Sequence, residues 1–247
     1  MRHVVIAAAT SAMMHTLLRR WLQQGPLTLS LIGRDPEKLR ILQQDLLIRQ
    51  PLAEIHCYTC DFEDSASIKD TLQRIHQKKP VDIALLAQGA LPDQTLCQED
   101  PAACAAALMI NAVSPVLFAS ILVKQFAAQQ HGHLVILSSV AGDRGRQSNY
   151  VYGASKGLLN RFAEGLQHRF AHTPITITLV KPGPTDTPMT WKLKAEGMRM
   201  ASVEEVAALI LQAIEKKRPL CYAPRRWQWI MLIIRHLPRR IFHRLQI

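Results

Sequence analysis

The sequence predicts one α/β domain built on a parallel sheet that is doubly wound, with helices on both faces. Short apolar runs at 4–9, 27–32, 55–59 and 81–86 have the length of buried strands, and helical patterns separate them. Strands that alternate with helices indicate βαβ units, whose right-handed crossovers keep the strands parallel. A length of 247 residues suits one such domain, and a composition of 48% hydrophobic and 20% charged residues excludes a disordered chain.

The later elements continue this alternation, and no internal repeat or linker interrupts it. The expected sheet has about seven strands. Residues 1–223 are expected to form one domain and residues 224–247 a tail. The further elements we expect are a helix to about Trp21, a helix that Pro36 opens, a polar helix to about Lys78, strands at 133–138 and 175–180, and a helix over 203–216.

Residues 101–123 carry no charge, so a hydropathy scan would accept them as a membrane span. Asn111 and Pro115 interrupt the middle of this stretch, and much of the rest is alanine. We therefore favour a soluble helical segment over a span.

Cysteine usage and the N-terminus both favour a cytoplasmic protein. The chain has five cysteines, an odd number without framework spacing, which is typical of reduced thiols. Cys57 and Cys60 should point to opposite faces of a strand, so no metal site is expected there. The strand-like run that begins near Val4 leaves no room for a signal peptide.

The strongest chemical signal is the stretch from Ser139 to Lys156, SVAGDRGRQSNYVYGASK. Tyr152 and Lys156 are four residues apart and share one face of a helix, where the ammonium should lower the pKa of the phenol. This makes Tyr152 a candidate general acid near neutral pH. Ser139 follows an apolar strand and can hydrogen-bond a carbonyl held against the phenol. Tyr150 is a natural control, because the residue four positions later is Ala154.

The order of strand, serine, loop, tyrosine and lysine, followed by KPGPTDT at 181–187, resembles the short-chain dehydrogenase/reductase family. The resemblance covers roughly residues 3 to 223 and implies a Rossmann-like fold. By this resemblance Tyr152 would donate a proton to a ketone oxygen as hydride from NADPH reaches the carbon. Lys156 would lower the tyrosine pKa and hold the nicotinamide ribose, Ser139 would orient the carbonyl, and Asn111 would position a water that links Lys156 to solvent.

The cofactor implied is NADP(H), although the phosphate loop departs from the family pattern. The family has T-G-x-x-x-G-x-G after the first strand, and residues 7–14 here read AAATSAMM. Ala8 and Ala12 replace the first two glycines, which is mild, whereas Met14 replaces the third and makes cofactor affinity the open question. The loop residues expected to contact the cofactor are Ala8, Thr10, Ser11 and Met13.

Other cofactor positions follow from the resemblance. Arg34, after the second strand, suits the 2′-phosphate of NADP, which it can bind bidentately; the alternative is an ordinary surface residue at a helix start. Asp61 and Phe62 match the adenine-binding position. Ala87-Gln88-Gly89 resembles N-A-G with Gln for Asn, or Gly89 is simply a turn glycine. The residues expected to surround the nicotinamide are Pro182, Gly183, Thr185 and Thr187, together with Tyr152 and Lys156.

The run at 138–152 also resembles the branch of polyprenylphosphoryl keto-sugar reductases, such as decaprenylphosphoryl-2-keto-pentose 2-reductases. The expected substrate is a lipid-linked or otherwise hydrophobic ketone, and residues 185–200, with three methionines, resemble a mobile lid. Two alternatives remain open. One is a soluble 3-oxoacyl-type ketoreductase, and the other is a non-catalytic, nucleotide-responsive relative, which the lost glycines favour.

The tail carries most of the charge. Residues 216–247 hold nine Lys and Arg residues and no acid, in a chain of net charge +11. Its apolar run of about eight residues is too short to span a bilayer. Basic residues beside Trp, Ile and Phe suit an anionic membrane surface at the inner face, and aliphatic composition argues against nucleic acid. The alternative is a contact between subunits of a homodimer or homotetramer, the oligomers that the family resemblance implies.

Overall fold

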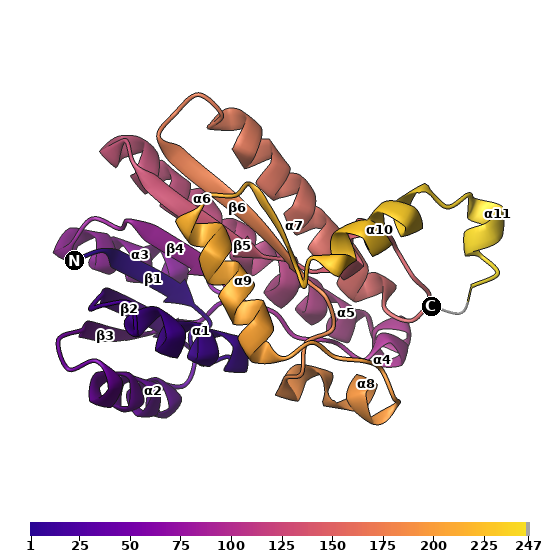
Figure 1. Ribbon diagram of the computed structural model, residues 1–247, viewed down its shortest axis with the longest axis horizontal. Coiled ribbons are helices and arrows are strands. Elements are labelled where there is room, and N and C mark those ends of the chain that lie inside the picture. Colours follow the sequence, from indigo (N-terminus) through magenta and orange to yellow (C-terminus); the bar gives the residue numbers. More distant parts are fainter. Residues whose placement is uncertain (246–247) are drawn as a thin grey trace.

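The computed structural model describes residues 1–245 and contains one seven-stranded sheet in which every strand pair is parallel. The predicted fold class is confirmed (Figure 1). The strand order is β3-β2-β1-β4-β5-β6-β7. The strands are β1 (His3–Ala7), β2 (Thr28–Gly33), β3 (Glu54–Thr59), β4 (Ile83–Leu86), β5 (Gly132–Leu137), β6 (Ile175–Pro182) and β7 (Leu220–Ala223).

The sheet order changes direction between β1 and β4. The chain builds outward from β1 to β3 and then returns to pair β4 on the other side of β1. In open parallel sheets such a switch point leaves a crevice beyond the carboxyl ends of the strands, where nucleotides bind. The residues that follow β1, β4, β5 and β6 therefore converge on one edge of the sheet.

Two helical layers cover the sheet (Figure 1). Apolar side chains of α1, α2 and α9 form one buried cluster against the sheet, and those of α3, α6 and α7 form the other. Both faces of β1, β2, β4, β5 and β6 are buried, which explains why these strands read as largely apolar runs, whereas the edge strand β3 is mostly exposed. The helices are α1 (Ala12–Leu22), α2 (Pro36–Arg49), α3 (Ser65–Lys78), α4 (Gln94–Glu99), α5 (Pro101–Leu108), α6 (Ser114–Gln129), α7 (Tyr150–Arg169), α8 (Trp191–Ala195), α9 (Val203–Glu215), α10 (Arg226–His236) and α11 (Arg239–Phe242).

The uncharged stretch forms a continuous helical segment from Pro101 to Gln129, with a π-helical turn, η1 (Met109–Val113), between α5 and α6. Its mean hydropathy of 2.1 and its length would allow it to cross a membrane, and half of that apolar window is buried within the protein. Phe118, Leu122 and Phe126 are fully buried in the second core cluster. These contacts are those of a core helix.

The tail is attached to the body by the inner face of α10. Trp227, Met231 and Ile234 lie on that face and pack with Val140 and Tyr222 in a small cluster, in which Met231 is fully buried. Beyond α10 the chain forms the short helix α11. Residues 246–247 lie outside the described residues.

Candidate active site

Four elements bring the predicted catalytic residues together at the carboxyl edge of the sheet. Ser139 follows β5 and caps the short turn η2 (Val140–Asp143), where its Oγ accepts a hydrogen bond of 3.1 Å from the Ala141 amide. Tyr152 and Lys156 lie on the first turns of α7, and Asn111 lies in η1. The Lys156 Nζ lies 5.8 Å from the centroid of the Tyr152 ring.

Lys156 is a buried lysine that forms no ion pair with a carboxylate of residues 1–245. Its side chain is held by two backbone carbonyls, because Nζ donates to Gln88 O at 3.2 Å and to Leu137 O at 3.4 Å. The residue is 2% exposed. Burial disfavours the charged form and lowers the pKa of Lys156 to about 8. The lysine therefore changes charge close to neutral pH.

The pKa of Tyr152 differs in direction from the one expected from the sequence. Burial raises the pKa of Tyr152, and hydrogen bonding with Ser139 acts in the opposite direction. The net direction is opposite to the expected one, because burial of the phenol outweighs the hydrogen bond with Ser139, while the Lys156 ammonium donates to the Gln88 and Leu137 carbonyls. The phenol is thus held as a neutral proton donor, next to a hydroxyl that favours release of the proton.

Asn111 braces the loop that follows β4. Its Nδ2 donates to Ala90 O and to Ala107 O, both at 2.9 Å, and its Oδ1 accepts from the Ala90 amide at 3.0 Å. Gly89 lies between Asn111 and Lys156, where a Cβ would be 3.1 Å from Oδ1 and 3.2 Å from Nζ. A side chain at Gly89 would be crowded against both groups, so glycine eases this close approach.

The loop after β1 keeps the shape of a phosphate loop without its glycines. Ala8 has a φ of +59°, the left-handed conformation that glycine adopts without cost. Alanine in this conformation costs about 1–2 kcal/mol. Ser11 caps α1 by accepting from the Met14 amide at 3.3 Å, so its hydroxyl proton remains available to an anion. Thr10 and Met13 are half-buried beside it.

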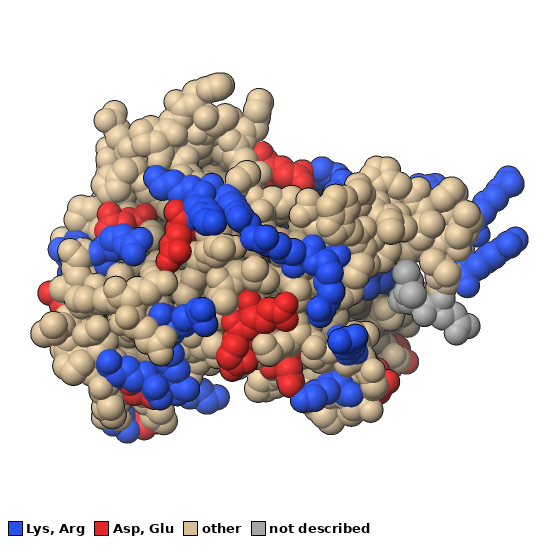
Figure 2. Space-filling model, viewed as in Figure 1, with Lys and Arg blue, Asp and Glu red and all other residues tan. Residues whose placement is uncertain are grey.

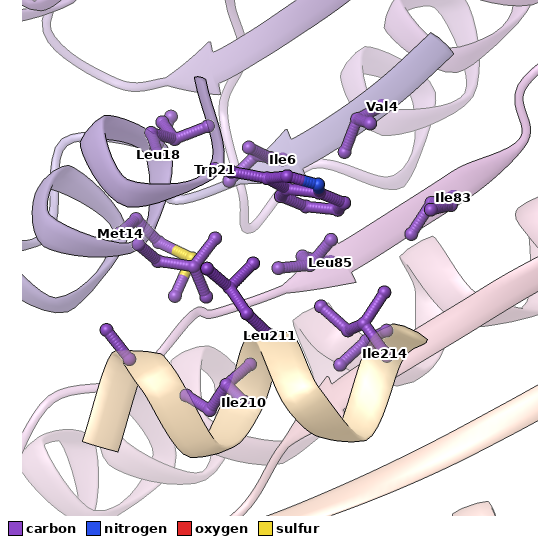
Figure 3. Packing of buried hydrophobic residues seen from close by; sticks show 14 of the residues in the cluster. Val4, Ile6, Met14, Leu18, Trp21, Ile83, Leu85, Ile210, Leu211 and Ile214 are labelled. Carbon is purple, nitrogen blue, oxygen red and sulfur yellow. The ribbon is translucent and has the colours of Figure 1, made fainter. Parts of the chain in front are cut away.

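Met14 lies away from this loop. Its side chain is fully buried and packs in the first core cluster with Ile210 and Leu211 of α9 (Figure 3). The third glycine position therefore faces the core through α1, and the larger residue is accommodated there. The concern that Met14 obstructs the phosphate loop is not supported by this packing.

The expected cofactor-binding residues outside the loop after β1 differ in their exposure to solvent. Arg34 is exposed directly after β2, and Asp61 is exposed with its Oδ1 bound to the Glu63 amide at 2.9 Å. Phe62 is 2% exposed and stacks edge-on against Phe118 at 5.5 Å, so only its backbone can meet a ligand. Gln88 is 2% exposed, and among the described residues neither its Oε1 nor its Nε2 has a hydrogen-bond partner.

The segment after β6 is covered by the tail. A Cβ at Gly183 would collide with the indole of Trp227, so α10 packs directly on this segment. Thr185 donates to Gly183 O at 2.9 Å, and Thr187 caps the turn η3 (Pro188–Thr190). Beyond it, a cavity of about 550 Å³ is lined by Asp186, Thr187, Pro188, Trp191, Lys194 and Ala195.

Comparison with known proteins agrees with this geometry. The family model described as short chain dehydrogenase matches residues 2–197. The chain belongs to the short-chain dehydrogenase family. An uncharacterized oxidoreductase of Mycobacterium tuberculosis is 30% identical over 247 residues, which covers 98% of this chain and 96% of the relative. One of Streptomyces coelicolor is 28% identical over 244 residues, covering 99% and 96%. A short-chain dehydrogenase from Sphingobium yanoikuyae, solved in complex with NADPH, has a TM-score of 0.84 at 18% identity and covers 97% of each chain.

In this short-chain dehydrogenase, sequence reasoning missed three residues that touch the site or its supports. Trp227 packs on Gly183, and Asp143 forms a buried ion pair with Lys181, with Oδ1 and Nζ 2.6 Å apart. The sequence analysis assigned the tail to a membrane surface or a subunit contact, and nothing in its pattern indicates that Trp227 faces inward onto Gly183. Asp143 stands four residues after Ser139 and Lys181 directly precedes Pro182, but nothing in the sequence pairs them.

Proposed function

We propose that this short-chain dehydrogenase is an NADP(H)-dependent reductase that converts a ketone to an alcohol with Tyr152 as the general acid. The observation that carries the proposal is the buried Lys156 beside Tyr152, whose phenol is also hydrogen-bonded with Ser139. A lysine without a carboxylate partner is costly to bury, and such groups are typical of functional sites.

Each side chain has a defined task in this reaction. The Ser139 hydroxyl donates to the ketone oxygen and places it against Tyr152, which supplies the proton as the alkoxide forms. Protonated Lys156 stabilises the phenolate that remains. Asn111 holds the loop after β4 through Ala90 and so keeps Gly89 between itself and Lys156. The proton then returns to Tyr152 from solvent, and the predicted water beside Asn111 would be its path.

The loop after β1 fits a dinucleotide. Ala8 already has the backbone conformation that such a loop needs, the N-terminus of α1 has free amides and a positive dipole end, and the Ser11 hydroxyl proton is available. The rest of NADP(H) would be bound by the exposed Arg34 and Asp61, the half-buried Thr187 and the Gln88 amide, which has no hydrogen-bond partner within residues 1–245. When bound, the cofactor supplies the hydride that the carbonyl carbon accepts.

Arg34 is the residue we expect to select NADPH over NADH. Arg34→Ala should weaken NADPH binding by about 10–100-fold, because hydrogen bonds to a charged phosphate contribute roughly 1.5–3 kcal/mol, and should leave NADH binding unchanged. Titration of nicotinamide fluorescence measures both affinities. Arg40→Ala is the matched control, since Arg40 is exposed on α2 and pairs with Glu37. Equal affinity of the wild-type protein for the two nucleotides would contradict this assignment, and binding of neither would overturn the proposed reductase.

The substrate we propose is a hydrophobic ketone, of which a polyprenyl-phosphate keto-sugar is one class. The segment between β6 and α9 presents Met189, Trp191 and Met198 to solvent, at 44%, 62% and 45% exposure. Lys192 and Lys194 alternate with these apolar groups, although Lys194 is paired with Asp186 at 2.6 Å. A surface of this kind can contact an apolar chain and a phosphate together. Turnover of 3-oxoacyl thioesters in preference to lipid-linked ketones would favour the soluble alternative.

An anionic lipid surface is the partner we propose for the outer face of α10 and α11. Trp229, Leu232 and Ile233 are 66%, 48% and 65% exposed on the side of α10 opposite to its packed face. The helices protrude from the body, and Lys and Arg side chains project from that end of the molecule in Figure 2. Apolar side chains among arginines, with no acid in the tail, complement anionic lipid better than a like-charged second copy.

Substitution of the outer face tests this proposal better than truncation, because deleting α10 would also uncover Val140 and Tyr222. The double variant Trp229→Asp, Ile233→Asp should bind phosphatidylglycerol vesicles about 100-fold less tightly than wild type in a sedimentation assay. Transfer of these two side chains from water into the lipid would contribute roughly 3 kcal/mol to binding. Ile48→Asp, at an 82% exposed position on α2, is the control and should bind normally. If wild type ignores vesicles and the double variant instead loses a dimer, α10 is an oligomer contact.

A further inference from the structure

A buried ion pair lies directly behind the catalytic residues. The Asp143 Oδ1 accepts from the Lys181 Nζ at 2.6 Å, and the two side chains are 3% and 4% exposed. Charged pairs are rarely enclosed this completely, because both ions lose their hydration. None of the roles described above requires this pair.

The Asp143 carboxylate also accepts hydrogen bonds from two neutral side chains on other elements. The Tyr222 hydroxyl on β7 donates to Oδ2 at 2.7 Å, and the Asn160 Nδ2 on α7 donates to Oδ1 at 3.2 Å. Burial and the Asp143 carboxylate raise the pKa of Tyr222, so this phenol stays a donor. One carboxylate thus connects the turn after β5 to α7, β6 and β7.

Two of the three partners of Asp143, Asn160 and Lys181, are next to residues of the active site. Asn160 stands one turn beyond Lys156, and its Oδ1 accepts from Ser138 Oγ at 2.7 Å, while that hydroxyl also lies 3.1 Å from Lys156 O. Ser138 immediately precedes Ser139. Lys181 immediately precedes Pro182 and the segment on which Trp227 packs.

The backbone around Asp143 has no room to move independently. A Cβ at Gly142 would lie 2.6 Å from the Lys156 carbonyl carbon and 2.8 Å from Asn160 Nδ2. A Cβ at Gly153 would lie 3.1 Å from Ala141 O. The turn η2 is therefore pressed onto α7 at both Tyr152 and Lys156, so a displacement of Asp143 displaces Ser139 relative to the phenol.

We propose that Asp143 is a positioning residue for the ketone reduction, which sets the placement of Ser139 relative to Tyr152 through its bonds to Asn160, Lys181 and Tyr222. The proposal rests on the reductase function proposed above. The competing interpretation is a buried ion pair that affects stability alone, and the two interpretations give different results in the following experiment.

The variants are Asp143→Asn, Lys181→Met and the double variant, with Asp45→Asn as the control. Asp45 lies on α2, away from the site, and forms ion pairs with Arg19 of α1 and Arg49 of α2. The single variants leave one buried charge without its partner and should melt at a lower temperature than the double variant. Asp45→Asn should change only the melting temperature.

The decisive readout is the titration of Tyr152, followed by tyrosinate absorbance as the difference between each protein and its own Tyr152→Phe counterpart. In the double variant we expect the midpoint to rise by about one pH unit, because Ser139 no longer supports the phenolate. With NADPH and a probe ketone such as 2-decanone, kcat should fall about tenfold or more, with KM changed less than about threefold. Recovery of thermal stability together with an unchanged titration and kcat would overturn the proposal. If the wild-type protein reduces no ketone, the reductase function fails, while the Tyr152 titration still tests the positioning role.

Discussion

Tyr152→Phe is expected to lower kcat for ketone reduction by about 10³–10⁴-fold, because general acid catalysis contributes that much in well-aligned sites. Phenylalanine keeps the ring and its packing but has no proton to donate. The affinity for NADPH should change by less than about threefold, since the substitution leaves the phosphate loop intact. Stopped-flow measurement of NADPH consumption with a hydrophobic ketone, combined with the fluorescence titration, separates the two effects.

Tyr150→Phe is the matched control for this experiment. Tyr150 begins α7, is 44% exposed and has Ala154 one turn later where Tyr152 has Lys156. Its loss should leave kcat unchanged. If Tyr152→Phe had no effect in any functional assay, that result would contradict the proposed reductase mechanism and favour the non-catalytic, nucleotide-responsive alternative.

Lys156→Met is expected to make the protein more stable and nearly inactive. The pKa of Lys156 is about 8 in the folded protein against an ordinary value of 10.5, so the unfolded chain binds the proton more tightly. The lysine therefore destabilises the fold fully below pH 8, and this penalty disappears as the pH rises through 10.5. At pH 7 the variant should gain about 1–3 kcal/mol in free energy of unfolding, and the gain should vanish near pH 10.5.

The same substitution should lower kcat by about 10²-fold or more, because no ammonium remains beside the phenolate. In the wild-type protein activity should likewise fall as the pH rises above about 8, where Lys156 loses its charge. Urea unfolding at several pH values measures the stability change. Lys124→Met, exposed on α6, should alter neither property. A loss of stability in Lys156→Met at pH 7 would contradict the account of Lys156 as a destabilising buried charge.

Much of the fold could be predicted because its strands are buried on both faces and appear as uninterrupted apolar runs. The seventh strand was not located, since Leu220–Ala223 is only four residues long and follows a basic stretch. The first strand was predicted to end two residues too late, at Ala9 and not at Ala7, because Ala8 has a left-handed conformation that an alanine run does not suggest.

The side-chain directions within the site could be predicted less well, since they depend on partners far away in the chain. Phe62 turns inward because Phe118 offers it an edge-on contact, and Met14 turns inward because α9 lies beneath α1. The pKa of Tyr152 is raised because the folded chain buries the phenol, and the spacing of Tyr152 and Lys156 does not report that burial. Spacing of four residues indicated that Tyr152 and Lys156 are neighbours, and it could not indicate what else surrounds them.

The contact between Asp143 and Tyr222 spans 79 residues of sequence, and Trp227 reaches Gly183 from still nearer the C-terminus. Chains fold from the N-terminus during synthesis, so strands β1 to β6 can assemble before these residues leave the ribosome. The turn η2, which follows Ser139, therefore gains its stabilising contacts last. In a nascent or prematurely ended chain, Ser139, Tyr152 and Lys156 would be present, but the contacts from Tyr222 and Trp227 would be missing. Catalytic activity is therefore expected only of the full-length chain.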